Sequence, residues 1–368
     1  MKINSYPVEY VIMGLILILS GFGIVMMYSA SSIYAMNKFN NYMFFLIQQI
    51  KWLSLGFIIM LIFSKINYHI FKKFAVSLLI FSWFIMIMGY VFKGDNPASR
   101  WLIINGRSWM TTSDLARVSL IIFTAFFIDK YKNNINNWKF IITRYAPFLI
   151  VTLLLILFQP DTSTTITIAM IITLMLFIAA VDWRFMAGML SVGIIGLMIK
   201  IIYTPYAINR IMNWNDIQKV QSLNAFGAGG LFGNGLGDSI IKNGFLPQAH
   251  TDFILPIVGE ELGFIGIFFL FILFWLLYSY GISVMREAPD LFSMFLALGI
   301  ITSTIIYFLI NAAYSIGLAP TTGLPMPFIS YGGSHTIFTL FSMGILLNIA
   351  SKSKIGPGKF YRGLSYEL

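Results

Sequence analysis

The residues best suited to chemistry lie close together in one segment of the chain. Asp252 follows His250 and Thr251 at the start of a long apolar run, and Glu260 and Glu261 lie within that run. A carboxylate at a helix N-terminus is stabilised in its ionised form and could take a proton from a hydroxyl group. Aspartate is also a common N-cap residue, so Asp252 is predicted to be a catalytic base or a helix cap. We expect at least one of the two glutamates to bind neighbouring helices instead.

Two glycine-rich segments could line a cavity. Residues 227–237 could bind a phosphate through backbone N–H groups, or could form a flexible re-entrant loop. No strand precedes this segment, as one would in a nucleotide-binding fold. Residues 323–334 combine two prolines and three glycines with Ser330 and Ser334. Irregular backbone of this kind is tolerated at membrane depth where it is buried or lines a cavity, although an ordinary rigid turn is the alternative.

Basic residues near these segments could contact a phosphate group. Four of them are predicted on loops at the same side of the protein: Arg100, Arg107, Arg210 and Lys242. Arginine suits such contacts because its guanidinium group binds phosphate through two hydrogen bonds. Each of these residues could instead anchor the chain at lipid headgroups. Asp114 and Arg117 are three residues apart on a predicted helix, so they could form an ion pair.

The composition places all these residues in a membrane protein. Of 368 residues, 58% are hydrophobic and 10% are charged, against about 25% charged in a soluble domain. This excludes a soluble globular enzyme and a disordered chain. The chain has no cysteine, and its three histidines lack the spacing of a zinc site. The net charge of +10 is explained by basic cytoplasmic loops, so no nucleic-acid partner is expected.

Ten apolar runs predict an all-α polytopic membrane protein with about ten transmembrane helices in one domain, 1–368. The predicted spans are 10–28, 48–63, 74–92, 115–128, 146–157, 164–181, 185–203, 253–283, 291–310 and 336–350. The eighth is unusually long, so we expect it to tilt or to project from the membrane. A large extracytoplasmic loop, 204–252, is expected between helices seven and eight. Basic residues gather on alternate loops, which places both termini in the cytoplasm.

Four blocks of the sequence resemble the SEDS family of polytopic cell-wall glycosyltransferases, whose members include FtsW, RodA and SpoVE. The blocks are Arg100-Trp101 through Ser113-Asp114-Leu-Ala-Arg117, Gln159-Pro-Asp161, Gln221-Ser222 through Gly237 to His250-Thr-Asp252-Phe with Glu260-Glu261, and Gly323 through Ser330 to Ser334. Tyr28-Ser-Ala-Ser and Asn209-Arg210-Ile resemble FtsW more than RodA. The family usually has a glutamate where Gln248 stands.

The resemblance implies a peptidoglycan glycosyltransferase that polymerises lipid II on the outer face of the bacterial cytoplasmic membrane. The essential acid of the family corresponds to Asp252, which would act as general base in a single inverting displacement. The substrate-binding residues that we predict are Arg100, Arg107, Asp161, Arg210, Lys242, His250, Thr251, Ser330 and Ser334. The residues that we predict to support them are Asp114, Arg117, Glu260 and Glu261.

The resemblance also implies partners. These are lipid II, a class B penicillin-binding protein that acts as transpeptidase, and other membrane proteins of the divisome or elongasome. The sequence shows no set of metal ligands, although Asp252 and a pyrophosphate could share a divalent cation, Mg²⁺ or Mn²⁺. Whether the chain serves division, elongation or sporulation stays open.

Two other functions are compatible with such a membrane protein. A lipid II flippase would move the lipid without making bonds, and it would not need a base at the outer surface. A non-catalytic scaffold is the third hypothesis, and the intact His250-Thr-Asp252-Phe block argues against it.

Overall fold

The computed structural model describes residues 7–91, 101–104, 107–203 and 217–353, in which helices predominate. The helices of ten residues or more are α1 (Val8–Phe39), α2 (Phe44–Lys65), α3 (His69–Val91), α4 (Thr112–Lys130), α6 (Ala146–Phe158), α7 (Thr162–Ile178), α8 (Trp183–Tyr203), α10 (Ile217–Gly229), α11 (Ile254–Arg286), α12 (Leu291–Ser315) and α13 (Gly333–Lys352). The short helix α5 (Trp138–Arg144) precedes α6.

The described helices confirm a polytopic membrane protein. Six of them, α1, α2, α3, α11, α12 and α13, are long and apolar enough to cross a membrane. The pair α5 and α6, bent by 50°, provides a seventh candidate. Each of the ten predicted spans overlaps a helix, but ten membrane crossings stay a prediction. The predicted loop 204–252 is partly helical, because α10 lies within it.

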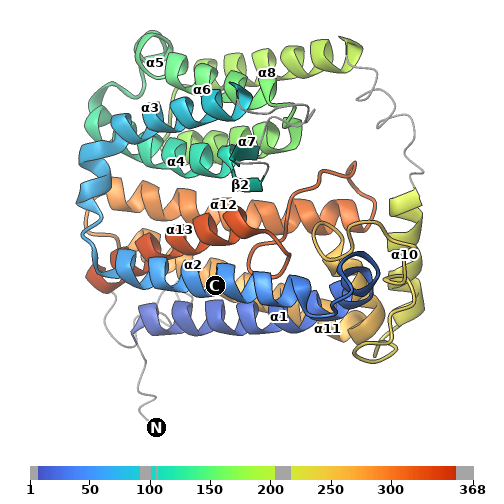
Figure 1. The fold of residues 1–368 in the computed structure, drawn as a ribbon. Helices are drawn as coiled ribbons and strands as arrows, with labels where there is room; N and C mark the ends of the chain where they lie inside the picture. Colours follow the sequence, from blue (N-terminus) through green and yellow to red (C-terminus); the bar gives the residue numbers. More distant parts are fainter. Residues whose placement is uncertain (1–6, 92–100, 105–106, 204–216, 354–368) are drawn as a thin grey trace.

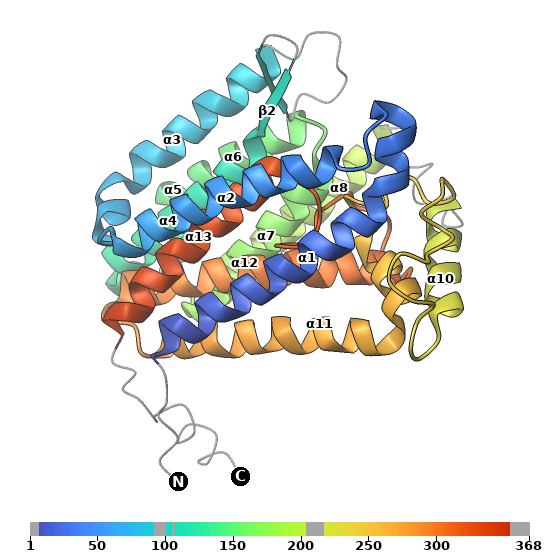
Figure 2. The same ribbon diagram turned by 60° about the horizontal axis from the view of Figure 1, so that its bottom comes forward.

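The long helices lie side by side, so the molecule has two ends (Figure 1). α1 begins and α13 ends at one of them, which we call the terminal end. The opposite end, called the α10 end, carries α10 and the segment that leads into α11; Figure 2 shows the same separation. Four helices that finish at the terminal end have a basic residue in the last turn, namely Lys65, Lys130, Arg286 and Lys352, whereas α7 has none.

The centre of the bundle is formed by α4, α12 and α13, in which most residues are buried. α2 packs along α13 at close range, because a Cβ atom at Gly344 would lie 2.6 Å from the main-chain oxygen of Met60. Small residues allow such approach between membrane helices. α3 lies at the periphery, where Phe81 and Phe84 are exposed. Lipid would cover these side chains, since soluble proteins rarely expose such surfaces.

A two-stranded antiparallel hairpin departs from the predicted all-α fold. β1 (Trp101–Ile104) pairs with β2 (Arg107–Thr111), and Ile104 is opposite Arg107. The sequence contained the signal, because the two residues between these strands are Asn-Gly, the strongest short hairpin pattern. The hairpin leads directly into α4, whose first turn carries Asp114.

Candidate active site

Asp252 lies in a short loop at the α10 end, between α10 and α11. The backbone N–H groups of Thr251, Asp252 and Phe253 donate to the main-chain oxygen of Gln248, at 3.1, 3.2 and 3.4 Å. The N-cap position of α11 falls on Phe253, so the interpretation of Asp252 as the cap loses its support. The side chains of Thr251 and Asp252 are partly exposed. Asp252 is thus neither buried nor fully exposed in this loop.

Two side chains of α12 hold the main chain of Asp252. The Nδ2 atom of Asn311 donates to the carbonyl oxygens of Asp252 and Leu324, at 3.0 and 2.8 Å. The hydroxyl of Tyr314 lies 2.6 Å from the same oxygen of Asp252. Both side chains are fully buried. Asn311 and Tyr314, called the α12 clamp, therefore join the Asp252 loop to the glycine-rich segment 323–334, where Gly323 lies beside the carboxylate.

His250 is enclosed by aromatic rings. It is 7% exposed, and its ring centroid lies 5.3 Å from that of Tyr34 and 4.4 Å from that of Phe45. Its main-chain oxygen accepts a hydrogen bond from the N–H of Tyr331 at 3.0 Å. Burial, and secondarily the charge of Lys38, lowers the pKa of His250 to about 4. A neutral, enclosed ring suits the positioning of the loop better than the attraction of a phosphate.

α11 is broken near its start, and whether this long span tilts or projects from the membrane stays a prediction. Gly263 has φ 65° and ψ −163°, a conformation that glycine adopts at no steric cost. A Cβ atom there would lie 2.6 Å from the main-chain oxygen of Leu231. The break leaves helix N–H groups without intrahelical partners, and that of Phe264 donates to the carbonyl oxygen of Gly230 at 2.9 Å.

The glycine-rich segment 227–237 therefore crosses the break in α11. Its N–H groups at Asn234 and Gly235 donate to the carbonyl oxygens of Glu260 and Glu261, at 2.9 and 3.0 Å. These two N–H groups are engaged in holding α11, so they are not available to cradle a phosphate. Whether this segment forms a re-entrant loop, the other expectation, stays a prediction.

Glu260 binds the chain that follows this segment. Its carboxylate is 1% exposed and accepts a hydrogen bond from the hydroxyl of Ser239. It also accepts from the backbone N–H groups of Ile240 and Ile241, at 2.9 and 3.4 Å. Its partners lie outside the helices, whereas the expected contact with a neighbouring helix is made by Glu261, which accepts from the hydroxyl of Ser29 in α1 at 2.5 Å.

Glu261 forms a buried ion pair with Lys242. The Nζ atom of Lys242 lies 2.8 Å from Oε1 of Glu261, and the two side chains are 4% and 0% exposed. The ammonium group also donates to the hydroxyl of Ser29 and to the carbonyl oxygen of Gly237, at 3.0 and 2.6 Å. All three donors of the lysine therefore have partners. A direct substrate contact by Lys242, as predicted, would have to displace one of them.

A second polar group lies inside the bundle, around Asp114. This carboxylate is 3.2 Å from Nδ1 of His335, 3.5 Å from Nη2 of Arg117 and 3.3 Å from the hydroxyl of Ser334. The predicted pair of Asp114 and Arg117 is thus present, and the guanidinium also lies 4.5 Å from the ring centroid of Tyr307. The sequence did not point to His335 or Tyr307, although polar residues within a membrane span are a usable signal.

Two other predicted substrate residues are also buried. Asp161 caps α7 by accepting from the N–H of Thr164 at 3.3 Å, and it accepts from the hydroxyl of Ser113 at 3.1 Å. Ser330 accepts from the N–H of Met326 at 2.9 Å within the segment 323–334. In this conformation both side chains support the fold around the site.

Three predicted arginines and the predicted cation site are not tested by the structure. Arg100 and Arg210 lie outside the described residues, and the structure does not describe the side chain of Arg107. The described part of the chain has no group of three or more His, Asp or Glu residues that could hold a metal ion. A divalent cation shared between Asp252 and a pyrophosphate stays a prediction.

Comparison with known proteins shows the family. A model of the cell cycle protein family of FtsW, RodA and SpoVE matches residues 10–355. A probable peptidoglycan glycosyltransferase FtsW from Geobacter metallireducens is 37% identical, over 97% of this chain and 99% of its own length. Stage V sporulation protein E from Bacillus subtilis is 32% identical, over 92% and 95%. The fold matches a chain of a peptidoglycan synthase complex that coordinates polymerization and crosslinking, with a TM-score of 0.75, 19% identity, and 97% and 100% coverage.

Proposed function

The chain belongs to the cell cycle protein family of FtsW, RodA and SpoVE, and from this premise we propose that it polymerises lipid II into peptidoglycan strands outside the cytoplasmic membrane. Its function is that of a peptidoglycan glycosyltransferase, in line with the name of a relative that matches nearly the whole chain. The observation that carries the proposal is the placement of Asp252. Asp252 is partly exposed, and its main chain is bound from two directions, by Gln248 and by the α12 clamp.

In the proposed reaction, Asp252 takes the proton from the 4-hydroxyl of the acceptor sugar. That oxygen forms a bond to the anomeric carbon of the donor, and the bond from this carbon to the pyrophosphate oxygen breaks. The lipid pyrophosphate leaves with the bonding electrons, so an α-linked donor gives a β-linked product. The α12 clamp would keep the base in place, which lowers the barrier by orienting the reacting groups. Thr251, partly exposed beside the base, is the predicted substrate residue best placed for direct contact.

The variant Asp252→Asn tests this mechanism. It preserves the shape of the side chain but cannot accept a proton at neutral pH. We expect the purified variant to be folded and polymerisation of lipid II to fall by roughly 100-fold or more, measured as glycan length on a gel. Glu260→Gln is the comparison, because its carboxylate is buried and bonded to Ser239 and to the N–H of Ile240; we expect a defect in folding or partial loss of activity there.

The lipid II flippase is the second candidate function. Asp252→Asn separates the two, because transport of a lipid does not require a base. Unchanged polymerisation by this variant would remove Asp252 from the mechanism. Wild-type protein that moves lipid II between leaflets but forms no glycan would favour the flippase.

We propose that the terminal end faces the cytoplasm. The positive-inside rule supports this orientation, because four helices finish there with a basic residue, although α1 carries Lys38 in its last turn at the α10 end. The chain has no cysteine, so single cysteines can be introduced. A cysteine at Asn224 in α10 should react with an impermeant thiol reagent in intact cells, whereas one at Asn136 should not. The reverse pattern would invert the proposed orientation.

The proposed partner is a class B penicillin-binding protein whose membrane helix docks on α11 and α12. The structural match to a peptidoglycan synthase complex is the motive for this part of the proposal. α12 is mostly buried, so α11 offers the larger free face, including Phe268 and Trp275 at 56% and 63% exposure. Photo-crosslinking groups at these two positions should capture the transpeptidase. Capture only from Phe81 and Phe84 of α3 would contradict this choice of surface.

A further inference from the structure

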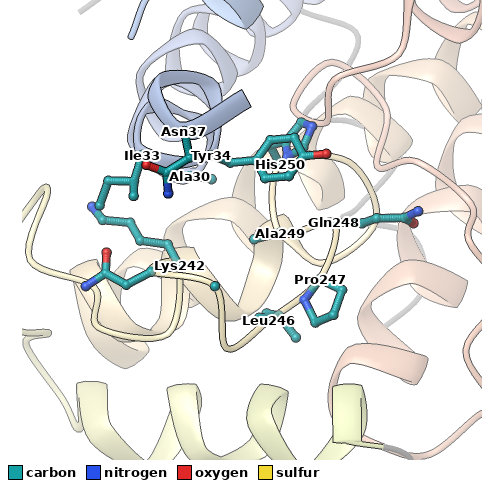
Figure 3. A pocket seen from close by; sticks show the side chains of 12 residues that line it. Ala30, Ile33, Tyr34, Asn37, Lys242, Leu246, Pro247, Gln248, Ala249 and His250 are labelled. Carbon is teal, nitrogen blue, oxygen red and sulfur yellow. The ribbon is translucent and has the colours of Figure 1, made fainter. Parts of the chain in front are cut away.

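A pocket of about 320 Å³ opens between α1 and the segment that leads to Asp252. One face of α1 forms its first wall with Ala30, Ile33, Tyr34 and Asn37, at helical spacing. The second wall is the chain from 242 to 250, which Figure 3 shows facing α1. This volume is at the lower end of the range for small-molecule sites, which is about 300–1,000 Å³.

The pocket lies on the part of α1 that is too long for a membrane. α1 has 32 residues and is about 48 Å long, whereas the hydrocarbon core is about 30 Å thick. From residue 28 onward its sequence is rich in hydroxyl and amide side chains, unlike the apolar run before it. The pocket is therefore expected in the aqueous or headgroup layer, where a water-soluble ligand can reach it.

The lining of the pocket combines apolar residues with polar ones and carries little net charge. The amide residues of the lining are Asn37, Asn243 and Gln248, all exposed, and the side chain of Gln248 points away from α1 in Figure 3. The only ammonium group of the lining, that of Lys242, is neutralised by Glu261, which lies behind the lining. No acidic side chain is among the twelve lining residues. Amides that donate and accept hydrogen bonds, without a free charge, suit hydroxyl and acetamido groups better than phosphates or carboxylates.

An aromatic ring completes this chemistry. Tyr34 stacks against His250 at 5.3 Å and keeps 43% of its surface exposed. Lys38, which is not part of the lining, donates to the Tyr34 hydroxyl at 3.1 Å and so fixes the ring. A partly exposed aromatic side chain offers an apolar surface for the C–H face of a sugar ring.

The pocket is also adjacent to the proposed base. His250 lines it and is two residues from Asp252, a separation of at most about 7 Å along the chain. We propose that this pocket is a saccharide subsite that binds an N-acetylated sugar unit next to the one that reacts at Asp252. This inference rests on the proposed function for the identity of the sugar, which belongs either to the growing strand or to the incoming lipid II.

The first test measures binding without catalysis. The probe is a soluble tetramer of β-1,4-linked N-acetylglucosamine, titrated into the full-length purified protein carrying Asp252→Asn. Asn37→Ala and Asn243→Ala should each weaken binding about 2- to 10-fold, the effect of losing one hydrogen bond. Asn224→Ala is the matched control, since this asparagine is exposed at the same end but does not line the pocket. No binding of the tetramer, or equal binding by pocket and control variants, would overturn the proposal.

The second test identifies the source of the sugar. Strand length and the KM for lipid II are measured for Asn37→Ala, Asn243→Ala and Asn224→Ala with Asp252 intact. If the pocket holds the growing strand, strands should shorten about 2- to 10-fold at an unchanged initial rate. If it holds the incoming lipid II, its KM should rise by that factor. Pocket variants that match Asn224→Ala in both quantities would refute the subsite.

The two tests also separate this inference from the proposed function. Unchanged polymerisation by Asp252→Asn, together with tetramer binding that depends on Asn37, would reject the catalytic role and leave the saccharide site standing. An inactive Asp252→Asn variant with pocket variants like Asn224→Ala would do the opposite. A lower melting temperature with no change in KM or strand length would assign the two asparagines to the fold alone.

Discussion

Replacement of Lys242 by methionine distinguishes a structural from a substrate-binding role for this residue. The methionine retains most of the volume but removes the charge. The carboxylate of Glu261, 0% exposed, then loses its only cationic partner in the described structure and keeps the hydroxyl of Ser29, which donates to it at 2.5 Å. Breaking a buried ion pair by removing one partner costs about 3–5 kcal/mol.

This loss should be visible as a lower melting temperature. The unfolding entropy of about 2 cal/mol/K per residue amounts to about 0.8 kcal/mol/K for 368 residues. The expected decrease for Lys242→Met is therefore about 4–6 °C, measured on purified protein in detergent. Glu261→Gln should also be destabilising, because it leaves the lysine buried without a carboxylate. The double variant should recover much of the loss, since it leaves no unpaired charge.

Activity decides between the two roles. Lys242→Met with an unchanged melting temperature but a raised KM for lipid II would refute the structural reasoning and support the substrate contact predicted from the sequence. A large loss of stability that the double variant does not relieve would also refute it, because the coupling between the two side chains would then be absent.

Three further predictions follow from the site. Gly263→Ala should sharply reduce the yield of monodisperse protein, since φ is 65° there, whereas Gly21→Ala should be tolerated because no atom lies within 4 Å of its Cβ position. Tyr314→Phe removes the hydroxyl that binds the main chain of Asp252 and should lower kcat up to about 10-fold with little change in KM; an equal change in both would argue against positioning. Burial lowers the pKa of His250 to about 4, so the folded protein favours the neutral ring. The contribution of His250 to the free energy of unfolding should therefore be full above about pH 6.5, and should fall by up to about 3 kcal/mol as the pH decreases towards 4. The melting temperature of His250→Phe should depend less on pH over this interval, and equal dependence would contradict the assignment.

The sequence predicts the helices well, because hydrophobicity alone decides where a chain crosses a membrane. Each of the ten apolar runs overlaps a helix, because a segment that must satisfy its backbone hydrogen bonds in lipid has little alternative. The hairpin also has a local signal, the turn dipeptide Asn105-Gly106, but the apolar runs predict only helices. The i,i+3 pair of Asp114 and Arg117 was also a local inference, and it is present.

Contacts between distant segments could not be predicted in this way. Periodicity treats 253–283 as one continuous helix, so it places Glu260 and Glu261 by their angle around one axis. The break at Gly263 and the segment 227–243 give the two glutamates different partners, one binding backbone N–H groups and the other Lys242. These partners depend on how the chain returns to α11, which no local pattern specifies.

The α12 clamp could be predicted only in part. The sequence shows that its residues share one helix face, but it does not show that they bind the Asp252 loop. Tyr307, Asn311 and Tyr314 lie four and three residues apart, so they occupy one face of α12. At one end of this face Tyr307 stacks on His335 at 5.1 Å, next to Asp114, and at the other end the clamp binds the Asp252 loop. A span needs no polar residues to cross a membrane, and each polar group buried there costs free energy unless it is bonded. The contacts of this face explain why it carries three polar side chains. They bind the Asp252 loop and the segment 323–334, and they pack against the buried pair of Asp114 and Arg117.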